Sequence, residues 1–188
     1  MVKGFILGIL VGLVLVVAGV FFYFSSGKAP VATGAPEMPF ERKLARMSIH
    51  AYLDRLPHPE PAIAADEKNF LEAATLYKEN CAMCHGLPGK ERTAIAEGMF
   101  PKPPQLFRGV GVTDDEPWES YWFVENGIRM SGMPGFKERL TESQIWQLTV
   151  LVKNADKIPD SVRNSLTGEL PPKVSAPPIS LPAPTAQQ

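Results

Sequence analysis

The chain has 188 residues, and its 19 Lys and Arg nearly balance 20 Asp and Glu, for a formal net charge of −1. This balance argues against a nucleic-acid-binding protein, which would present a basic face or stripe. The length predicts one domain with additional segments. In chain order we expect a short N-terminal segment, a membrane anchor, a flexible linker, an accessory helix with a Pro-rich turn, a folded domain and a Pro-rich extended tail, over residues 1–4, 5–24, 25–40, 41–60, 61–158 and 159–188.

Residues 5–24 form an apolar run of twenty positions without a charge. At about 1.5 Å per residue, a helix of this length spans the roughly 30 Å hydrocarbon core of a bilayer. A cleaved signal peptide is the rival interpretation, but its apolar region is about 7–15 residues long and is followed by small residues. Residues 21–24 are all aromatic, although cleavage at 25–27 stays open. A buried core helix is disfavoured because the run has no polar face. We therefore favour an uncleaved anchor.

The two segments after the anchor differ in character. Residues 25–40 are rich in small residues and proline, which predicts a flexible tether. A helix is expected over 41–56, because its apolar positions recur at helical spacing; they are Ile49, Tyr52, Leu53 and Leu56. This helix would pack on the domain or lie at the membrane interface. A cluster of prolines interrupts the chain at 57–61.

Three further helices are predicted in the folded domain. Their start and stop signals are, in order, Asp66 and Asn80, Pro117 and Gly127, and Thr141 and Ala155. Thr141 followed by Gln144 has the spacing of a capping box. No strong alternating strand pattern is present, so the domain is expected to be all-α.

Residues 81–85, between the first and second of these helices, read Cys-Ala-Met-Cys-His and contain the only two cysteines of the chain. This is the C-x-x-C-H signature of covalent c-type haem attachment. Each thiol can add to one haem vinyl group, and an imidazole nitrogen of His85 can become the first axial ligand of the iron. A disulfide is the alternative for an exported protein, but the adjacent histidine favours thioethers.

The second axial ligand must come from elsewhere in the chain. His50 and His58 precede the motif, and Met83 lies inside it and cannot reach around the ring. The remaining candidates are Met99, Met130 and Met133. The last lies in Ser-Gly-Met-Pro-Gly, where Gly and Pro favour an extended loop that leaves room for a thioether to point at iron. A methionine that only fills a gap in the core is the competing interpretation.

Residues 66–157 resemble a class I cytochrome c domain, similar to the monohaem modules of cytochrome oxidase subunits and bacterial dehydrogenase cytochromes. Four segments carry the resemblance in the same order, namely 76–86, 101–106, 122–128 and 132–136. It implies a class I cytochrome c fold around one covalent haem c, preceded by a single transmembrane helix. Gln105 departs from the pattern, because many relatives have Asp there.

The resemblance also implies roles for individual residues. Met133 would be the distal ligand opposite His85, and Met130 is the second choice. A carbonyl of Pro103 or Pro104 would accept the imidazole N–H of His85. The pocket would include Pro104 and Leu106, with Trp122 reaching a haem propionate. The first and last helices would pair Tyr77 and Ala73 with Trp146 and Leu148. Independently of the resemblance, Arg108 and Arg129 could bind propionates through charge-assisted hydrogen bonds, but we expect each to be a solvated surface charge.

These features predict an electron-transfer protein rather than an enzyme. It would act in a respiratory or photosynthetic chain, preferably as a subunit of a membrane redox complex rather than as a shuttle between soluble electron-transfer proteins. Lys3 precedes the anchor and four cations follow it by residue 46, so charge alone places the domain in the cytoplasm. Haem attachment in the related cytochromes occurs on the other side, and we therefore expect an extracytoplasmic, periplasmic domain. The alternatives are a haem peroxidase or gas sensor, and a structural anchor with a vestigial haem site.

Overall fold

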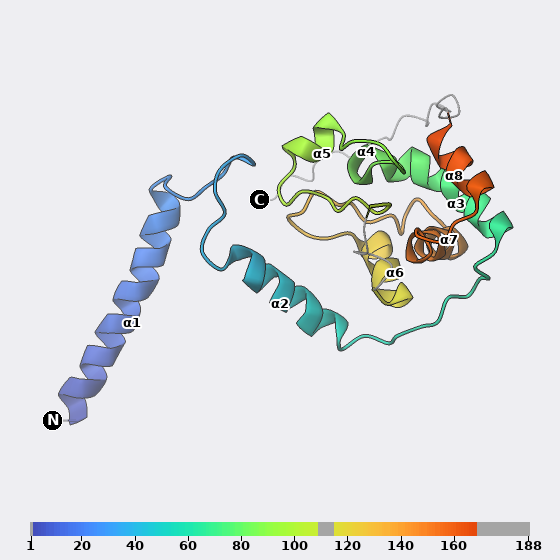
Figure 1. Cartoon of the computed structure of the whole chain (residues 1–188). Coiled ribbons are helices and arrows are strands. Elements are labelled where there is room, and N and C mark those ends of the chain that lie inside the picture. Colours follow the sequence, from blue (N-terminus) through green and yellow to red (C-terminus); the bar gives the residue numbers. More distant parts are fainter. Residues whose placement is uncertain (1, 109–114, 169–188) are drawn as a thin grey trace, which may run out of the picture.

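The structure is a computed structural model that describes residues 2–108 and 115–168 (Figure 1). The regular secondary structure of these residues is helical. The one β-type pairing among them is an isolated antiparallel bridge between Ile128 and Met133. The helices are α1 (Val2–Ser25), α2 (Glu41–Leu53), α3 (Glu67–Asn80), α4 (Ala82–His85), α5 (Ala94–Gly98), α6 (Pro117–Asn126), α7 (Glu142–Lys153) and α8 (Asp160–Thr167). The predicted all-α character is confirmed for the described part of the chain.

Helix α1 stands apart from the other helices in Figure 1, and none of its residues is buried. Among the described residues it is the one helix long and apolar enough to cross a membrane, with a mean hydropathy of 3.0. A signal sequence near an N-terminus meets the same criterion. By length and composition the helix is thus a candidate membrane span.

The core of the domain forms where α3 packs between α7 and α8. Helix α7 is buried along most of its length, from Ile145 to Val152. The buried cluster combines residues of three helices, namely Phe70, Ala73, Ala74 and Tyr77 with Leu148, Leu151 and Val152 and with Val162 and Leu166. Burying such side chains is the main favourable contribution to folding. The expected packing of α3 on α7 is confirmed, but Trp146 lies against Tyr121 of α6, with ring centroids 4.3 Å apart.

The predicted helix ends follow from their capping residues. The Asp66 carboxylate accepts a hydrogen bond of 2.9 Å from the Asn69 backbone N–H, which satisfies one of the free donors at the start of α3. Thr141 and Gln144 form the reciprocal capping box of α7. Pro117 stands in the first turn of α6, and Gly127 caps its end.

The expected extended tail is wrong over its first ten residues, because 160–167 form α8. Val162 and Leu166 are fully buried against the core, and the Ser161 hydroxyl donates a hydrogen bond to the Glu67 carboxylate of α3. Their spacing of four residues is a helical signal that the neighbouring prolines obscured. The rest of the predicted tail, 169–188, lies outside the described residues.

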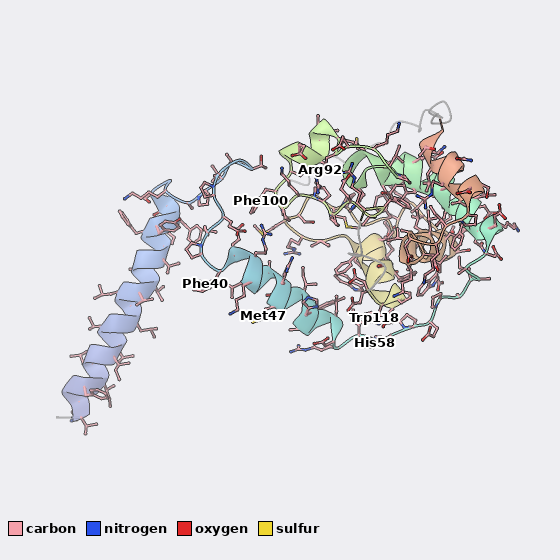
Figure 2. The ribbon with its side chains drawn as sticks, viewed as in Figure 1. Phe40, Met47, His58, Arg92, Phe100 and Trp118 are labelled. Atoms are coloured by element: carbon pink, nitrogen blue, oxygen red, sulfur yellow. The ribbon has the colours of Figure 1, made fainter. Side chains whose placement is uncertain are left out.

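The helix expected over 41–56 ends at Leu53, and its last turn packs on the domain. Leu53 is 1% exposed, and the ring of Tyr52 lies 5.5 Å from that of Trp122. Beyond the helix, His58 stacks on Trp118 with ring centroids 3.9 Å apart, and Figure 2 labels the two residues beside one another. Two aromatic contacts, from Tyr52 and His58, therefore fasten the segment 52–58 to α6.

Candidate functional site

A mostly apolar cavity of about 280 Å³ opens between α3, α6, α7 and the loops around residues 99–106 and 128–136. Six of the seven site residues predicted from the sequence line it, namely Cys81, Cys84, His85, Pro104, Leu106 and Met133. These residues come from three separate segments of the chain. The fold thus gathers the attachment motif and both expected axial ligands around one cavity.

The proximal side of the cavity is a direct continuation of α3. Cys81 caps that helix, α4 adds one turn that ends at His85, and Gly86 then turns the chain away with a φ of 74°. The buried hydroxyl of Tyr77 donates a hydrogen bond of 2.9 Å to the Gly86 carbonyl. The position of the histidine is therefore fixed from both sides by helical backbone and by a buried hydrogen bond.

A backbone carbonyl sets the orientation of the imidazole of His85. Its Nδ1–H donates a hydrogen bond of 2.9 Å to the Pro104 carbonyl, so the expectation that one of the two prolines accepts it is met by Pro104. Because a carbonyl can only accept, the proton lies on Nδ1 and the lone pair of Nε2 is available. This is the tautomer that ligation of a metal through Nε2 requires.

Burial is the main cause of the pKa shifts of His85 and Cys81 on the proximal side of the cavity. It lowers the pKa of His85, against the smaller opposite effect of the Pro104 hydrogen bond, and so favours the neutral imidazole that binds metals. Burial, followed by the charge of Cys84, raises the pKa of Cys81 to about 12. Both cysteines are free, so the expected alternative of a disulfide is not formed.

The distal side of the cavity is the loop of residues 128–136, which we call the distal loop and which is held by hydrogen bonds of its own backbone. The Ile128 N–H donates to the Met133 carbonyl at 3.1 Å, and the Met133 N–H donates to the Ser131 hydroxyl at 3.2 Å. Gly127 has a φ of 71°, and a Cβ there would lie 2.5 Å from the Gly135 nitrogen. Only glycine accommodates both the left-handed backbone and this close approach.

The structure shows which of the three candidate methionines lie at the cavity. Met133 and Met99 line the cavity, whereas Met130 is 92% exposed at the surface. Met99 lies near the distal loop, because a Cβ at Gly132 would come within 2.8 Å of its Cε. Met99, rather than Met130, is thus the competitor of Met133.

The predicted propionate contact of Trp122 finds no support in its position. Trp122 is not among the residues that line the cavity, and its ring packs against Tyr52 and Phe123. The register of α6 explains this, since Trp118 and Trp122 share one face while Phe123 and Val124 lie on the cavity side. Arg108 is held by Lys90 and Glu91, as expected for a surface charge.

Several cavity residues were not assigned to the pocket from the sequence. They are apolar or small side chains of α6, α7 and the distal loop, among them Phe123, Val124, Ile128, Phe136 and Thr149. Their helical spacing predicted burial, but nothing in it separates a residue that faces a cavity from one that faces the core. Gln105, the departure from the family pattern, packs against Gly86 and has a buried Nε2 with no hydrogen-bond partner.

These residues fit a covalent haem c. The apolar cavity offers two free thiols in the attachment spacing, a neutral imidazole with an available Nε2, and a thioether from a separate loop. Imidazole and thioether are the axial ligands that cytochromes of the c type use. No group of three or more His, Cys, Asp or Glu that could hold a separate metal ion occurs in residues 2–108 and 115–168.

Comparison with known proteins agrees with this geometry. Residues 68–152 match the family model described as cytochrome C oxidase, cbb3-type, subunit III. The match begins in the first turn of α3, includes the attachment motif and the distal loop, and ends near the end of α7. No curated protein and no solved structure matches the chain.

Proposed function

We propose that the chain, whose residues 68–152 match a cytochrome c domain of the cbb3 oxidase-subunit type, holds one haem c and carries single electrons at a membrane. One observation carries the proposal most directly. His85, with its Nδ1 bonded to Pro104, and Met133 line the same cavity as Cys81 and Cys84. Attachment and axial ligation thereby come together in one site.

Each of the four residues has a distinct task. Cys81 and Cys84 would hold haem through thioether bonds, each thiol adding across one vinyl double bond with its proton passing to the neighbouring vinyl carbon. His85, whose ring is held by the Pro104 carbonyl, would bind the iron through Nε2, and Met133 would offer its sulfur from the distal loop. When bound, haem supplies the one-electron Fe(III)/Fe(II) couple. The thioether favours the reduced form and raises the potential relative to two imidazoles.

Closure of both axial positions favours electron transfer over chemistry at the iron. A peroxidase or gas-binding protein would place a second His or an Arg over the distal position. The lining residues of the described chain include neither an arginine nor a histidine other than His85. Electrons would therefore enter and leave through the edge of the haem.

The remaining chain supports attachment to a membrane. Helix α1 would anchor the domain as a single span of the cytoplasmic membrane, with the haem domain on the periplasmic side, where haem c is attached in the related cytochromes. The family match favours a membrane redox complex as partner, and a soluble electron-transfer protein is the second candidate. We favour a fixed subunit, because α2 is an addition that a free shuttle does not require.

The full chain, expressed with a haem c maturation system and isolated in membranes, tests the proposal. We expect a haem-stained band on a denaturing gel, a reduced-minus-oxidised spectrum of a c-type cytochrome, and slow carbon monoxide binding by the reduced protein. An absent stained band would indicate the vestigial site, and rapid carbon monoxide binding would indicate a gas-binding or catalytic protein.

The choice between subunit and shuttle has its own test. Gentle solubilisation of native membranes should co-purify the cytochrome with other redox-active subunits in a fixed ratio. Recovery of the cytochrome alone, with undiminished reduction by a soluble donor, would instead favour the shuttle.

A further inference from the structure

One face of α2 carries a row of large apolar side chains that remain exposed. Phe40, Leu44 and Met47 are 70%, 54% and 57% exposed, and their spacing of four and three residues places them on one side of the helix. Ala51, also exposed, continues this row one turn later. We call these four residues the α2 stripe. Exposed apolar side chains gathered in this way mark an interaction surface.

The stripe faces away from the domain. Leu53, which is buried, is nine residues after Leu44, or two and a half turns, and thus lies on the opposite side of α2. Figure 2 labels Phe40 just before α2 and Met47 on it, well separated from Trp118 and His58, where the following segment meets α6. The last turn of α2 is therefore fixed to the domain, through Tyr52 and Leu53, while the α2 stripe stays exposed.

The backbone at the start of α2 gives a second sign of a specialised surface. Phe40 has a φ of 65°, a left-handed conformation that bulky side chains rarely adopt. It precedes the helix without a side-chain capping bond. A strained backbone that also presents an exposed aromatic ring is typical of functional surfaces.

Charge separates this part of the chain from the haem domain. Residues 26–55 contain five Lys and Arg and three Asp and Glu, whereas residues 56–188 contain 13 and 17. A recess of about 480 Å³ at the start of α2 is lined by Arg42, Lys43 and Arg46 beside Phe40, together with Glu37 and Glu41. Arg42 is paired with Glu37 at 3.1 Å, which leaves Lys43 and Arg46 as the cations that this recess offers to a partner. Cations next to an apolar stripe suit an anionic lipid surface.

The connection to α1 keeps α2 near the bilayer. Only 15 residues, 26–40, join the two helices, which gives a reach of roughly 50 Å when fully extended. Backbone hydrogen bonds from Ser26 to Phe22 and from Ala35 to Ala32 fold the connection and shorten it. Figure 1 shows α2 between α1 and the haem domain.

We propose that α2 lies along the surface of the membrane, with the α2 stripe inserted among the lipid headgroups and with Lys43 and Arg46 paired with anionic lipids. This inference rests on the proposed function for the anchor α1, and goes beyond it by assigning α2 a partner. The proposal also explains the cations that follow the anchor. They lie on the proposed periplasmic side, where the positive-inside tendency alone would not place them, and pairing with anionic lipids gives them a role there. Because Tyr52 contacts Trp122, and the neighbouring Phe123 and Val124 line the cavity, α2 would fix the orientation of the haem to the membrane.

A fluorescent label at two positions of α2 tests the proposal. The haem-loaded full chain is placed in nanodiscs of phosphatidylcholine with phosphatidylglycerol, as Met47→Cys or as Ala45→Cys, each labelled with a polarity-sensitive dye. Residue 45 is also exposed but lies about 200° around the helix from residue 47. Quenching is measured as the ratio between nanodiscs with and without spin-labelled lipid, so that energy transfer to the haem cancels.

We expect the Met47→Cys label to be quenched at least threefold more strongly than the Ala45→Cys label. Equal quenching at the two positions would overturn the proposal. The difference should shrink in phosphatidylcholine alone, and an unchanged difference would refute the pairing with anionic lipids. A third outcome would be that spin-labelled lipid does not quench the Met47→Cys label, while the protein forms dimers in detergent that shield this label. That result would assign the α2 stripe to contact with a second copy instead of lipid.

Two readouts on the same samples separate this inference from the proposed function. Loss of the haem spectrum would indicate failure of the electron-carrier proposal, and extraction by alkaline carbonate would indicate failure of the anchor. A doubly charged variant, Leu44→Glu with Met47→Glu, should keep both properties yet broaden the haem orientation in aligned bilayers. An unchanged orientation in that variant would contradict the role assigned to α2.

Discussion

The two sides of the cavity hold the two proposed axial ligands in different ways. His85 ends a helical turn that continues α3, and the Tyr77 hydroxyl and the Pro104 carbonyl secure it. Met133 lies in a loop whose shape depends on the close approach of Gly127 and Gly135. The position of the proposed proximal ligand is thus set by local structure, and that of the proposed distal ligand by backbone contacts between segments.

This difference implies different sensitivities to mutation. A change on the proximal side should affect haem attachment and local hydrogen bonding. A change on the distal side should act through the conformation of the loop and leave attachment intact. The following variants test this distinction, from the largest expected effect to the smallest.

Replacement of both Cys81 and Cys84 by serine should abolish covalent attachment, because a hydroxyl does not replace the thiol in forming the thioether. The haem-stained band on a denaturing gel should disappear. Met83→Ala is the matched control, since this residue of the same motif is 60% exposed and should leave the band unchanged. A stained band that persists in the double variant would rule out thioether attachment at this motif.

Gly127→Ala should destabilise the domain by roughly 2–4 kcal/mol, because the new Cβ meets backbone atoms and the residue has a left-handed φ. Urea unfolding of the haem-loaded protein measures this change in the free energy of unfolding. The control is Gly98→Ala, where a Cβ meets no atom within 4 Å, and which should be neutral or stabilising by up to about 1 kcal/mol. Similar stabilities for the two variants would contradict the role of the close approach.

Tyr77→Phe should cost roughly 1–2 kcal/mol, since it leaves the Gly86 carbonyl without its buried donor. The same unfolding experiment applies, and the haem-stained band should remain. Tyr121→Phe, a change of the same chemistry in α6, should cost less than about 0.5 kcal/mol. A Tyr77→Phe variant as stable as the unaltered chain would show that this bond does not secure the proximal turn.

The sequence predicted those elements whose signals are local. Asp66 and the pair Thr141 and Gln144 mark helix starts by hydrogen bonds that depend only on nearby residues. The attachment motif likewise contains its own chemistry. Short segments of sequence were therefore enough to predict that the attachment motif and Met133 belong to the site.

Contacts between distant segments were harder to predict. Trp122 was expected at the haem and instead meets Tyr52, because the register of α6 turns it toward a helix outside the family resemblance. Val162 and Leu166 complete the core from a region whose prolines suggested an extended tail. In both cases the outcome depends on a packing partner that local spacing does not reveal.

The most direct test of the account compares three methionine variants in their oxidised spectra. Coordination of a methionine sulfur to Fe(III) haem gives a weak charge-transfer band at the red end of the visible spectrum. We predict that Met133→Ala loses this band and binds carbon monoxide rapidly when reduced, while Met130→Ala and Met99→Ala keep the band. A band that persists in Met133→Ala, or that is lost in Met99→Ala alone, would contradict the assignment of Met133 as the distal ligand.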